Sequence, residues 1–137
     1  MLDLDEAVLE VVAQWVLKAE SDLKTAALLL RVRRDCPTDI VCFHVQQCVE
    51  KYVKAMLVLN AIEFPRTHQI SLLLALVPAQ VRPVLTPQEQ DRLTEYAVTT
   101  RYPGDYDPIS REEARQAVQT ARRLRNQVRR RLPEVVC

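Results

Sequence analysis

The sequence predicts an all-α protein, an up-and-down bundle of about five helices in which two long helices come first. Only one glycine occurs among the 137 residues, and aromatic residues make up 5% of them. A sheet needs glycine in its hairpin turns and aromatic or β-branched residues in its strands, so this composition disfavours a β fold. Apolar residues instead recur every three or four positions, which is typical of helices with one buried face. A chain of this length is expected to form one domain over residues 1–137.

The first long helix is expected over residues 4–33, where an apolar line continues through the whole segment. The line consists of Leu4, Val8, Val12, Trp15, Ala19, Leu23, Ala26 and Leu30. Asp22 lies beside this line, and the simplest role of its carboxylate is a hydrogen bond to a neighbouring helix. Arginines close the segment, where cations suit the negative end of the helix dipole.

The second long helix is expected to begin near Thr38 and to end near Ile62, because Pro65 prevents its continuation. Its predicted core side holds Val41, Val45, Cys48, Tyr52, Ala55, Met56 and Leu59. The opposite side holds Phe43, Gln47, Glu50, Lys51 and Lys54. Glu50 and Lys54 have the favourable order for an ion pair between residues four positions apart. This polar side is either a solvated helix face or a groove for a ligand or a second protomer.

Two shorter helices are expected next. Residues 70–77 form a brief apolar segment, and Thr67 is a candidate cap for its start. A fourth helix is expected to run to about residue 100 from Thr86, because Pro87 and Glu89 follow in the order of a capping box. Its predicted buried residues are Leu93, Tyr96 and Ala97.

A polar loop over residues 101–108 is expected to lead to the last helix. Pro103 and Gly104 suit the centre of a type II turn, which needs a positive φ at its third residue. The loop also holds Arg101, Tyr102 and Tyr106. Side chains of these types stack on bases or grip phosphates, and their simpler role is to hold the loop on the core through phenol hydrogen bonds.

The last helix is expected to lie between Ser110 and Pro133, with Glu113 completing a second capping box. Its predicted buried line is Ala114, Ala117, Val118, Ala121, Leu124, Val128 and Leu132. Residues 111–131 contain eight arginines and two glutamates, a local charge of +6, whereas the whole chain carries +1 and the remainder therefore −5. This asymmetry favours an anionic or acidic partner for the helix, although a long helix also needs solubilising charge.

Several classes of protein are disfavoured by the sequence. No apolar run reaches the roughly 18 residues that span a bilayer, and the acidic N-terminus differs from a signal peptide, so a cytoplasmic protein is expected. The four cysteines form no Cys-x-x-Cys pair and no metal-ligand spacing with the two histidines. No phosphate-binding glycine loop and no carboxylate cluster for Mg²⁺ occurs, and we expect neither metal nor cofactor. Cys42 with His44 is a weak candidate nucleophile, since a buried thiol is its ordinary interpretation.

One motif in the second predicted helix is similar to the signature of a known family. It reads Phe43-His44-x-Gln46-Gln47-x-x-Glu50-Lys51-x-x-Lys54-Ala55, and it resembles the signature helix of HEPN domains, small all-helical domains found alone or beside nucleotidyltransferases. Other matching pieces follow in order, namely Ala19-Glu20-Ser21-Asp22-Leu23, Pro65-Arg66-Thr67-His68, Arg101-Tyr102-Pro103 and Glu113-Ala114. The resemblance extends over about residues 12–132, and it implies a single HEPN-like domain that forms a homodimer.

The ribonucleases of this family resemble one another in an arginine that is followed, after a gap of four to six polar residues, by a histidine, and both lie in a cleft between two protomers. The histidine acts there as general acid or base, and the arginine stabilises the phosphorane. Neither His44 nor His68 is preceded by arginine at that spacing. The resemblance therefore implies a non-catalytic member that binds nucleotide or RNA and acts with a small nucleotidyltransferase in a toxin-antitoxin-like or regulatory pair. In such pairs the nucleotidyltransferase binds its partner or attaches nucleotide to it, here to Tyr102 or Tyr106.

The predicted ligand groove combines the polar side of the second helix with two loops. Its residues are Gln47, Glu50, Lys51, Lys54, Arg66, His68, Arg101, Tyr102 and Tyr106. The cations are expected to meet phosphate, an aromatic ring to stack on a base, and Gln47 to contact a base edge or ribose. Two alternatives stay open. One is a metal-independent ribonuclease that uses His68 and Arg101, and the other is a helical dimer that scaffolds a partner without any ligand.

Overall fold

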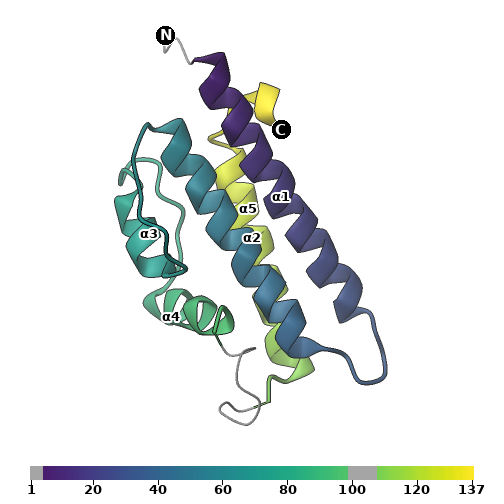
Figure 1. Ribbon diagram of the computed structural model, residues 1–137. Helices are drawn as coiled ribbons and strands as arrows, with labels where there is room; N and C mark the ends of the chain where they lie inside the picture. Colours follow the sequence, from purple (N-terminus) through teal and green to yellow (C-terminus); the bar gives the residue numbers. More distant parts are fainter. Residues whose placement is uncertain (1–4, 99–107) are drawn as a thin grey trace.

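A computed structural model describes residues 5–98 and 108–137, which form a bundle of five α-helices and one short 3₁₀ helix (Figure 1). The elements are α1 (Glu6–Leu30), α2 (Thr38–Leu59), α3 (Ile70–Leu76), α4 (Pro87–Tyr96), α5 (Arg111–Arg129) and the 3₁₀ helix Glu134–Val136. No strand occurs in the described ranges, and two long helices come first. The predicted all-α, up-and-down bundle is therefore confirmed.

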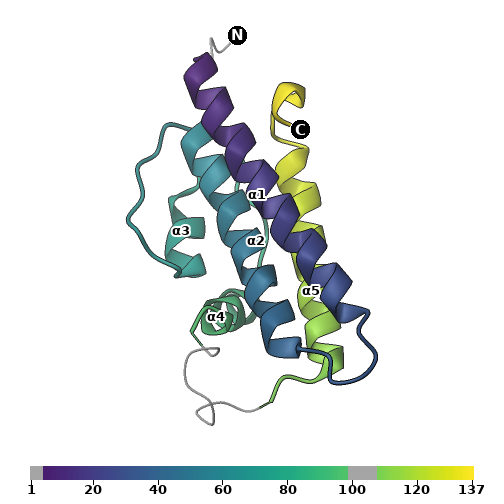
Figure 2. The ribbon, with the colours of Figure 1, turned by 45° about the vertical axis from the view of Figure 1, so that its right-hand side comes forward.

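Helix α2 is the central element of the bundle, because it contacts each of the other four α-helices. Helices α1 and α5 lie along it, while α3 and α4 cover another side of it (Figures 1 and 2). As a result, 13 of its 22 residues are buried, more than a single apolar stripe provides. The polar side of α2 was predicted to be a solvated face or an open groove, but much of it lies inside the bundle.

The apolar lines predicted for the helices form one core. Val12, Ala19 and Ala26 of α1 are fully buried in it, and so are Val41, Val45, Cys48, Tyr52 and Ala55 of α2 and Ala114, Ala121, Leu124 and Val128 of α5. Leu93, Tyr96 and Ala97 near the end of α4 are also buried, as predicted. Together, these lines hold the three long helices in register and fix which α2 side chains face α1.

The two long helices end earlier than predicted. Helix α1 ends at Leu30 rather than residue 33, and Asp35 then turns the chain with a φ of 53°. Helix α2 ends at Leu59 rather than residue 62, because Ala61 adopts a φ of 57°. The amide of Ile62 donates to the carbonyl of Leu57, the pattern of a Schellman motif, which satisfies the last carbonyls of the helix.

The predicted start of α4 is right, whereas the predicted starts of α5 and α3 are wrong in part. Thr86 and Glu89 form the expected capping box at α4. Ser110 caps α5, but Glu113 does not complete a box, because its carboxylate binds side chains of α4 instead. At α3 the N-cap is Gln69, and the hydroxyl of Thr67 accepts from the Gln69 amide before the helix begins.

Two other end predictions also differ from the structure. Helix α4 ends at Tyr96, whereas it was predicted to reach about residue 100, and residues 99–107 lie outside the described ranges. Order was predicted to end at Pro133, but a 3₁₀ turn follows and buries Val136 against the bundle. In the described ranges, no helix has both the length and the apolar character needed to cross a membrane.

Candidate functional site

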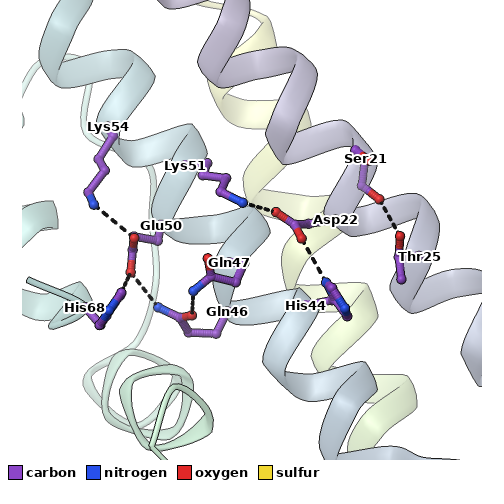
Figure 3. A network of polar contacts seen from close by, with 10 residues as sticks. All are labelled: Ser21, Asp22, Thr25, His44, Gln46, Gln47, Glu50, Lys51, Lys54 and His68. Carbon is purple, nitrogen blue, oxygen red and sulfur yellow. Dashed lines mark hydrogen bonds and ion pairs between the residues drawn. The ribbon is translucent and has the colours of Figure 1, made fainter.

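A polar network lies where α2 faces α1 and the loop before α3 (Figure 3). We call it the central polar network, and its members are Asp22, His44, Gln46, Gln47, Glu50, Lys51, Lys54 and His68. It has two centres, each a carboxylate that accepts hydrogen bonds from cationic or amide groups. The first carboxylate comes from α1 and the second from α2.

The first centre is the carboxylate of Asp22. Its Oδ1 lies 2.8 Å from Nδ1 of His44, and its Oδ2 accepts from Nζ of Lys51 at 2.5 Å. His44 and Lys51 are seven residues apart, two helical turns, so both lie on the side of α2 that faces α1. The interpretation of Asp22 as a hydrogen-bond partner of a neighbouring helix is confirmed.

The second centre is the carboxylate of Glu50. Its Oε1 accepts from Nε2 of Gln46 at 2.8 Å, and its Oε2 accepts from Nζ of Lys54 at 2.9 Å. Gln46 and Lys54 lie four residues before and after Glu50, so one side of α2 supplies all three groups. Nδ1 of His68 lies 2.7 Å from Oε1. Since an ionised carboxylate only accepts, Nδ1 of His68 carries the proton and Nε2 is the outer nitrogen.

Burial and hydrogen bonding act in opposite directions on Glu50. Burial raises the pKa of Glu50, but the hydrogen bonds from His68, Lys54 and Gln46 outweigh it and hold that pKa below its ordinary value. Glu50 is therefore ionised at neutral pH. Lys54 is the matching buried cation, and its ammonium lies 5.6 Å from the ring centroid of Trp15 and 5.7 Å from that of Phe64. The predicted Glu50–Lys54 ion pair is confirmed.

The exposure of the network differs from the groove predicted from the sequence. The side chains of Glu50 and Lys54 are only 4% and 11% exposed, so neither lines an open surface. Lys51 is 21% exposed, and His68 is 54% exposed. These two side chains reach the surface, whereas the pair between them is enclosed because α1 and the loop before α3 cover it.

The remaining predicted site residues fall into two groups. Gln47 is half-buried and donates to Oε1 of Gln46 at 2.6 Å, while Arg66 is exposed two residues before His68. The structure thus brings the predicted residues of α2 together with His68. Arg101, Tyr102 and Tyr106 lie outside the described residues, and their part in the site stays a prediction.

Three members of the network were missed as site residues, namely Asp22, His44 and Gln46. The sequence carried a signal for two of them. Asp22 interrupts the buried side of α1, and a buried carboxylate requires partners. Gln46 is fully buried and precedes Glu50 by one helical turn, which favours contact. His44 belongs to the motif that resembles the HEPN signature, but its partner Asp22 lies on another helix, so the motif does not show this contact.

The arginines of α5 are partly neutralised by acids of other helices. Arg125 binds Glu20 of α1 through Nε and Nη2 at 2.8 Å each, and Arg129 binds the same carboxylate at 2.9 Å. The Tyr52 hydroxyl of α2 also donates to it at 2.7 Å. Burial raises the pKa of Glu20, but the contacts with Arg125 and Tyr52 outweigh this and lower it. One carboxylate therefore ties three helices together.

A groove of about 580 Å³ lies between α4 and α5, and none of the predicted site residues that the structure describes lines it. Its two arginines are already paired, since Arg92 binds Glu113 and Arg123 binds Glu89. The Tyr96 hydroxyl donates to Glu113 at 2.6 Å. Because each cation has an acid beside it, this groove offers little attraction for phosphate.

Cys42 does not have the properties of a nucleophile. It is fully buried, and burial raises the pKa of its thiol to about 12. A thiol with such a pKa is almost entirely protonated at neutral pH, and the thiolate is the reactive form. His44 next to it binds Asp22 instead.

The fold and the sequence of this chain are those of a HEPN domain. The sequence matches the HEPN domain family over residues 12–131, and the chain belongs to this family. Its fold is similar to that of TT1696 from Thermus thermophilus, with a TM-score of 0.73, 24% identity, and coverage of 88% of this chain and 98% of that chain. It is also similar to ST0689, described as an archaeal HEPN homologue, with a TM-score of 0.63, 27% identity, and coverage of 88% and 96%.

A curated relative is similar over a shorter stretch. It is named "Putative toxin MJ1304", comes from Methanocaldococcus jannaschii, and is 46% identical over 57 residues. The match covers 42% of this chain and 35% of that protein, so it spans about a third of the relative's length.

Proposed function

We propose that this protein binds the phosphate of a nucleotide or RNA at the exposed edge of the central polar network. In this proposal it acts with a small nucleotidyltransferase in a toxin-antitoxin-like or regulatory pair. The observation that carries the proposal is the hydrogen bond between buried Glu50 and exposed His68. A fixed carboxylate behind an imidazole sets the ring orientation, so the outer nitrogen is held ready for a ligand.

The exposure of the charged groups supports an anionic ligand. The carboxylates of Asp22 and Glu50 are 12% and 4% exposed, whereas the His68 side chain is 54% exposed. Lys51 and His44, which hold Asp22, are also more exposed than it is. Arg66 adds a guanidinium at the surface near His68 in the chain. An approaching phosphate therefore meets cationic and imidazole groups before it meets either carboxylate.

Binding is tested by calorimetric titration of ATP into the purified protein and into an Arg66→Gln/His68→Gln variant. Both side chains are exposed, so their replacement removes ligand contacts with little loss of packing. We expect at least a tenfold loss of affinity, about 1.4 kcal/mol. A Lys18→Gln/Arg34→Gln variant, which changes two exposed cations outside the network, is the control. If both variants are folded and bind ATP with equal affinity, the proposed phosphate site at Arg66 and His68 is contradicted.

A metal-independent ribonuclease is the second candidate, and the same Glu50–His68 pair favours it. A carboxylate that holds the Nδ1 proton of a histidine leaves Nε2 available as general base. The arginine proposed for this reaction, Arg101, lies outside the described residues. Incubation with a labelled RNA separates the candidates. Cleavage that disappears in His68→Ala supports the ribonuclease, and saturable binding without cleavage supports the binding protein.

The partner and the oligomeric state belong to the same proposal. Family membership and the toxin name of the partial relative support a toxin-antitoxin-like setting. Light scattering tests the homodimer. Co-expression with a nucleotidyltransferase encoded beside this protein, followed by mass spectrometry, tests whether nucleotide is attached to Tyr102 or Tyr106. A stable complex or an added nucleotide supports the pairing, whereas a helical scaffold without ligand predicts a complex but no nucleotide response.

A further inference from the structure

A shallow groove lies between α1 and α5, and a second shallow groove adjoins it on α5, on a different part of the molecule from the central polar network. They have volumes of about 350 and 460 Å³ and share Arg125 and Asn126. We call them the α1–α5 grooves, and their lining residues are Glu20, Leu23, Lys24, Ala27, Arg122, Arg125, Asn126, Arg129 and Arg130. Five of these side chains are cationic and one is anionic, which leaves a net charge of +4.

The geometry of α1 separates this surface from the central polar network. Glu20 lines the α1–α5 grooves and Asp22 belongs to the network. Residues two positions apart on a helix differ by about 200° in direction, so the two carboxylates point to different sides of α1. A ligand on one surface therefore leaves the other accessible.

Glu20 indicates what these grooves recognise. Its carboxylate accepts hydrogen bonds from Nε and Nη2 of Arg125 and from Nη1 of Arg129, the arrangement by which guanidinium groups hold carboxylate or phosphate oxygens. The carboxylate of Glu20 neutralises only part of the positive charge of the grooves. Within the described residues, Lys24, Arg122 and Arg130 have no acidic partner, although Nε of Arg130 donates to the Asn126 carbonyl. These three side chains supply the excess charge.

We propose that the α1–α5 grooves bind the phosphate backbone of an RNA strand. Arg122 and Arg130 lie eight residues apart on α5, about 12 Å along the helix axis, so the strip is long enough to follow several nucleotides. Among the residues that the structure describes, the lining has only two apolar side chains, Leu23 and Ala27, and no aromatic ring. Protein interfaces have an apolar or aromatic centre, whereas interfaces with nucleic acids are polar and strongly positive. Without rings for stacking, binding is independent of base sequence.

This surface goes beyond the proposed nucleotide site, and the two are measured separately. Fluorescence anisotropy with a labelled oligouridylate, at several salt concentrations, reports RNA binding. In Arg122→Gln/Arg130→Gln we expect about tenfold weaker binding, and a salt slope smaller by about 1.4 because two phosphate contacts are lost. Arg33→Gln/Arg34→Gln removes the same charge from exposed residues outside the grooves, and its affinity is expected to stay within twofold of the original.

A substitution that increases the positive charge of the grooves provides a second test. Glu20 is the only acid among the described lining residues, and Glu20→Gln raises their net charge from +4 to +5. RNA affinity is expected to rise severalfold in this variant, because Arg125 and Arg129 no longer face a competing carboxylate. Circular dichroism checks that it is folded. If it is not, Arg122→Gln/Arg130→Gln decides alone, since neither arginine pairs with an acid in the described part of the chain.

Two results would overturn the inference. One is unchanged RNA affinity in folded Arg122→Gln/Arg130→Gln. The other is tighter binding of a polyglutamate peptide than of RNA with the same number of charges, which would assign the surface to an acidic protein. ATP titrations on the same samples keep the surfaces apart. Loss of RNA binding in Arg122→Gln/Arg130→Gln, with ATP binding intact, supports the α1–α5 grooves. If the original protein binds RNA but not ATP, only the proposed nucleotide site is contradicted.

Discussion

Glu50 and His68 are 18 residues apart in the chain, yet Nδ1 of His68 donates to the Glu50 carboxylate over 2.7 Å. The acid is 4% exposed and the imidazole is 54% exposed. The pair therefore connects the inside of the bundle to its surface. It also links stability to the proposed function, because the carboxylate that stabilises α2 against its neighbours is the one that orients the exposed ring.

Removal of the buried Glu50 carboxylate is expected to lower the free energy of unfolding strongly. Glu50→Ala leaves the ammonium of Lys54 buried without its partner, and breaking a buried ion pair in this way costs about 3–5 kcal/mol. Urea unfolding followed by circular dichroism measures the loss. The control is Glu95→Ala, because the Glu95 carboxylate is 55% exposed and its pairing with Arg92 contributes at most about 1 kcal/mol. Similar losses in both variants would contradict the burial of the network.

The lowered pKa of Glu50 predicts a pH dependence. Its pKa lies below 4.5 in the folded state, so the unfolded chain binds more protons between that pKa and about pH 4.5. The stabilisation is complete above pH 4.5 and is lost as the pH falls through the lowered value. Glu50→Gln is therefore expected to flatten the curve of unfolding free energy against pH below 4.5. Some slope remains, because Glu20, Glu89 and Glu113 also have lowered pKa values.

The junction of three helices at Glu20 predicts a cost for Tyr52→Phe. Tyr52 is fully buried, and its hydroxyl donates to Oε2 of Glu20 at 2.7 Å. Hydrogen bonds to charged groups contribute about 1.5–3 kcal/mol, and we expect a loss of free energy of unfolding in this range. Thr25→Val is the control, since the Thr25 hydroxyl donates to a carbonyl at an exposed site. Neutral surface substitutions change the free energy of unfolding by up to about 0.5 kcal/mol. A smaller loss than this in Tyr52→Phe would contradict the proposed strength of the contact.

The burial of the thiols predicts an order of reactivity. Cys137 is exposed, whereas Cys42 is buried with a pKa of about 12 and Cys48 is buried with its pKa also raised. A thiol reagent at pH 8 is expected to modify Cys137 within minutes and to leave Cys42 and Cys48 unmodified until the protein unfolds. Mass spectrometry of digested samples locates the label. Rapid labelling of Cys42 in the folded protein would restore it as a candidate nucleophile.

Much of the fold could be predicted from the sequence, because local patterns determine it. The apolar lines of α1 and α5 fix their buried faces, and the Thr86–Glu89 capping box fixes the start of α4. The helix ends were less predictable. Ala61 ends α2 in a left-handed conformation, which costs a non-glycine residue about 1–2 kcal/mol and has no sequence signal.

One contact of the central polar network could be predicted from the sequence, but the burial of that network could not. The spacing of Glu50 and Lys54 gave their pairing, since that contact is local to one helix. It could not show that four helices surround α2, and this is why the pair is enclosed. Similarly, the arginine surplus of α5 was visible, whereas the neutralisation of Arg125 by Glu20, 105 residues away, depends on tertiary packing.

The most direct test of the central claim is a nitrogen NMR titration of the histidine side chains with ATP. The structure predicts that His68 carries its proton on Nδ1 in its neutral form, and the proposed site predicts that Nε2 of His68 shifts saturably as ATP is added. Assignment uses the His68→Gln variant, which lacks the signal. Saturable ATP binding with no change at His68 would contradict the account, because the ligand would then bind away from the exposed edge of the central polar network.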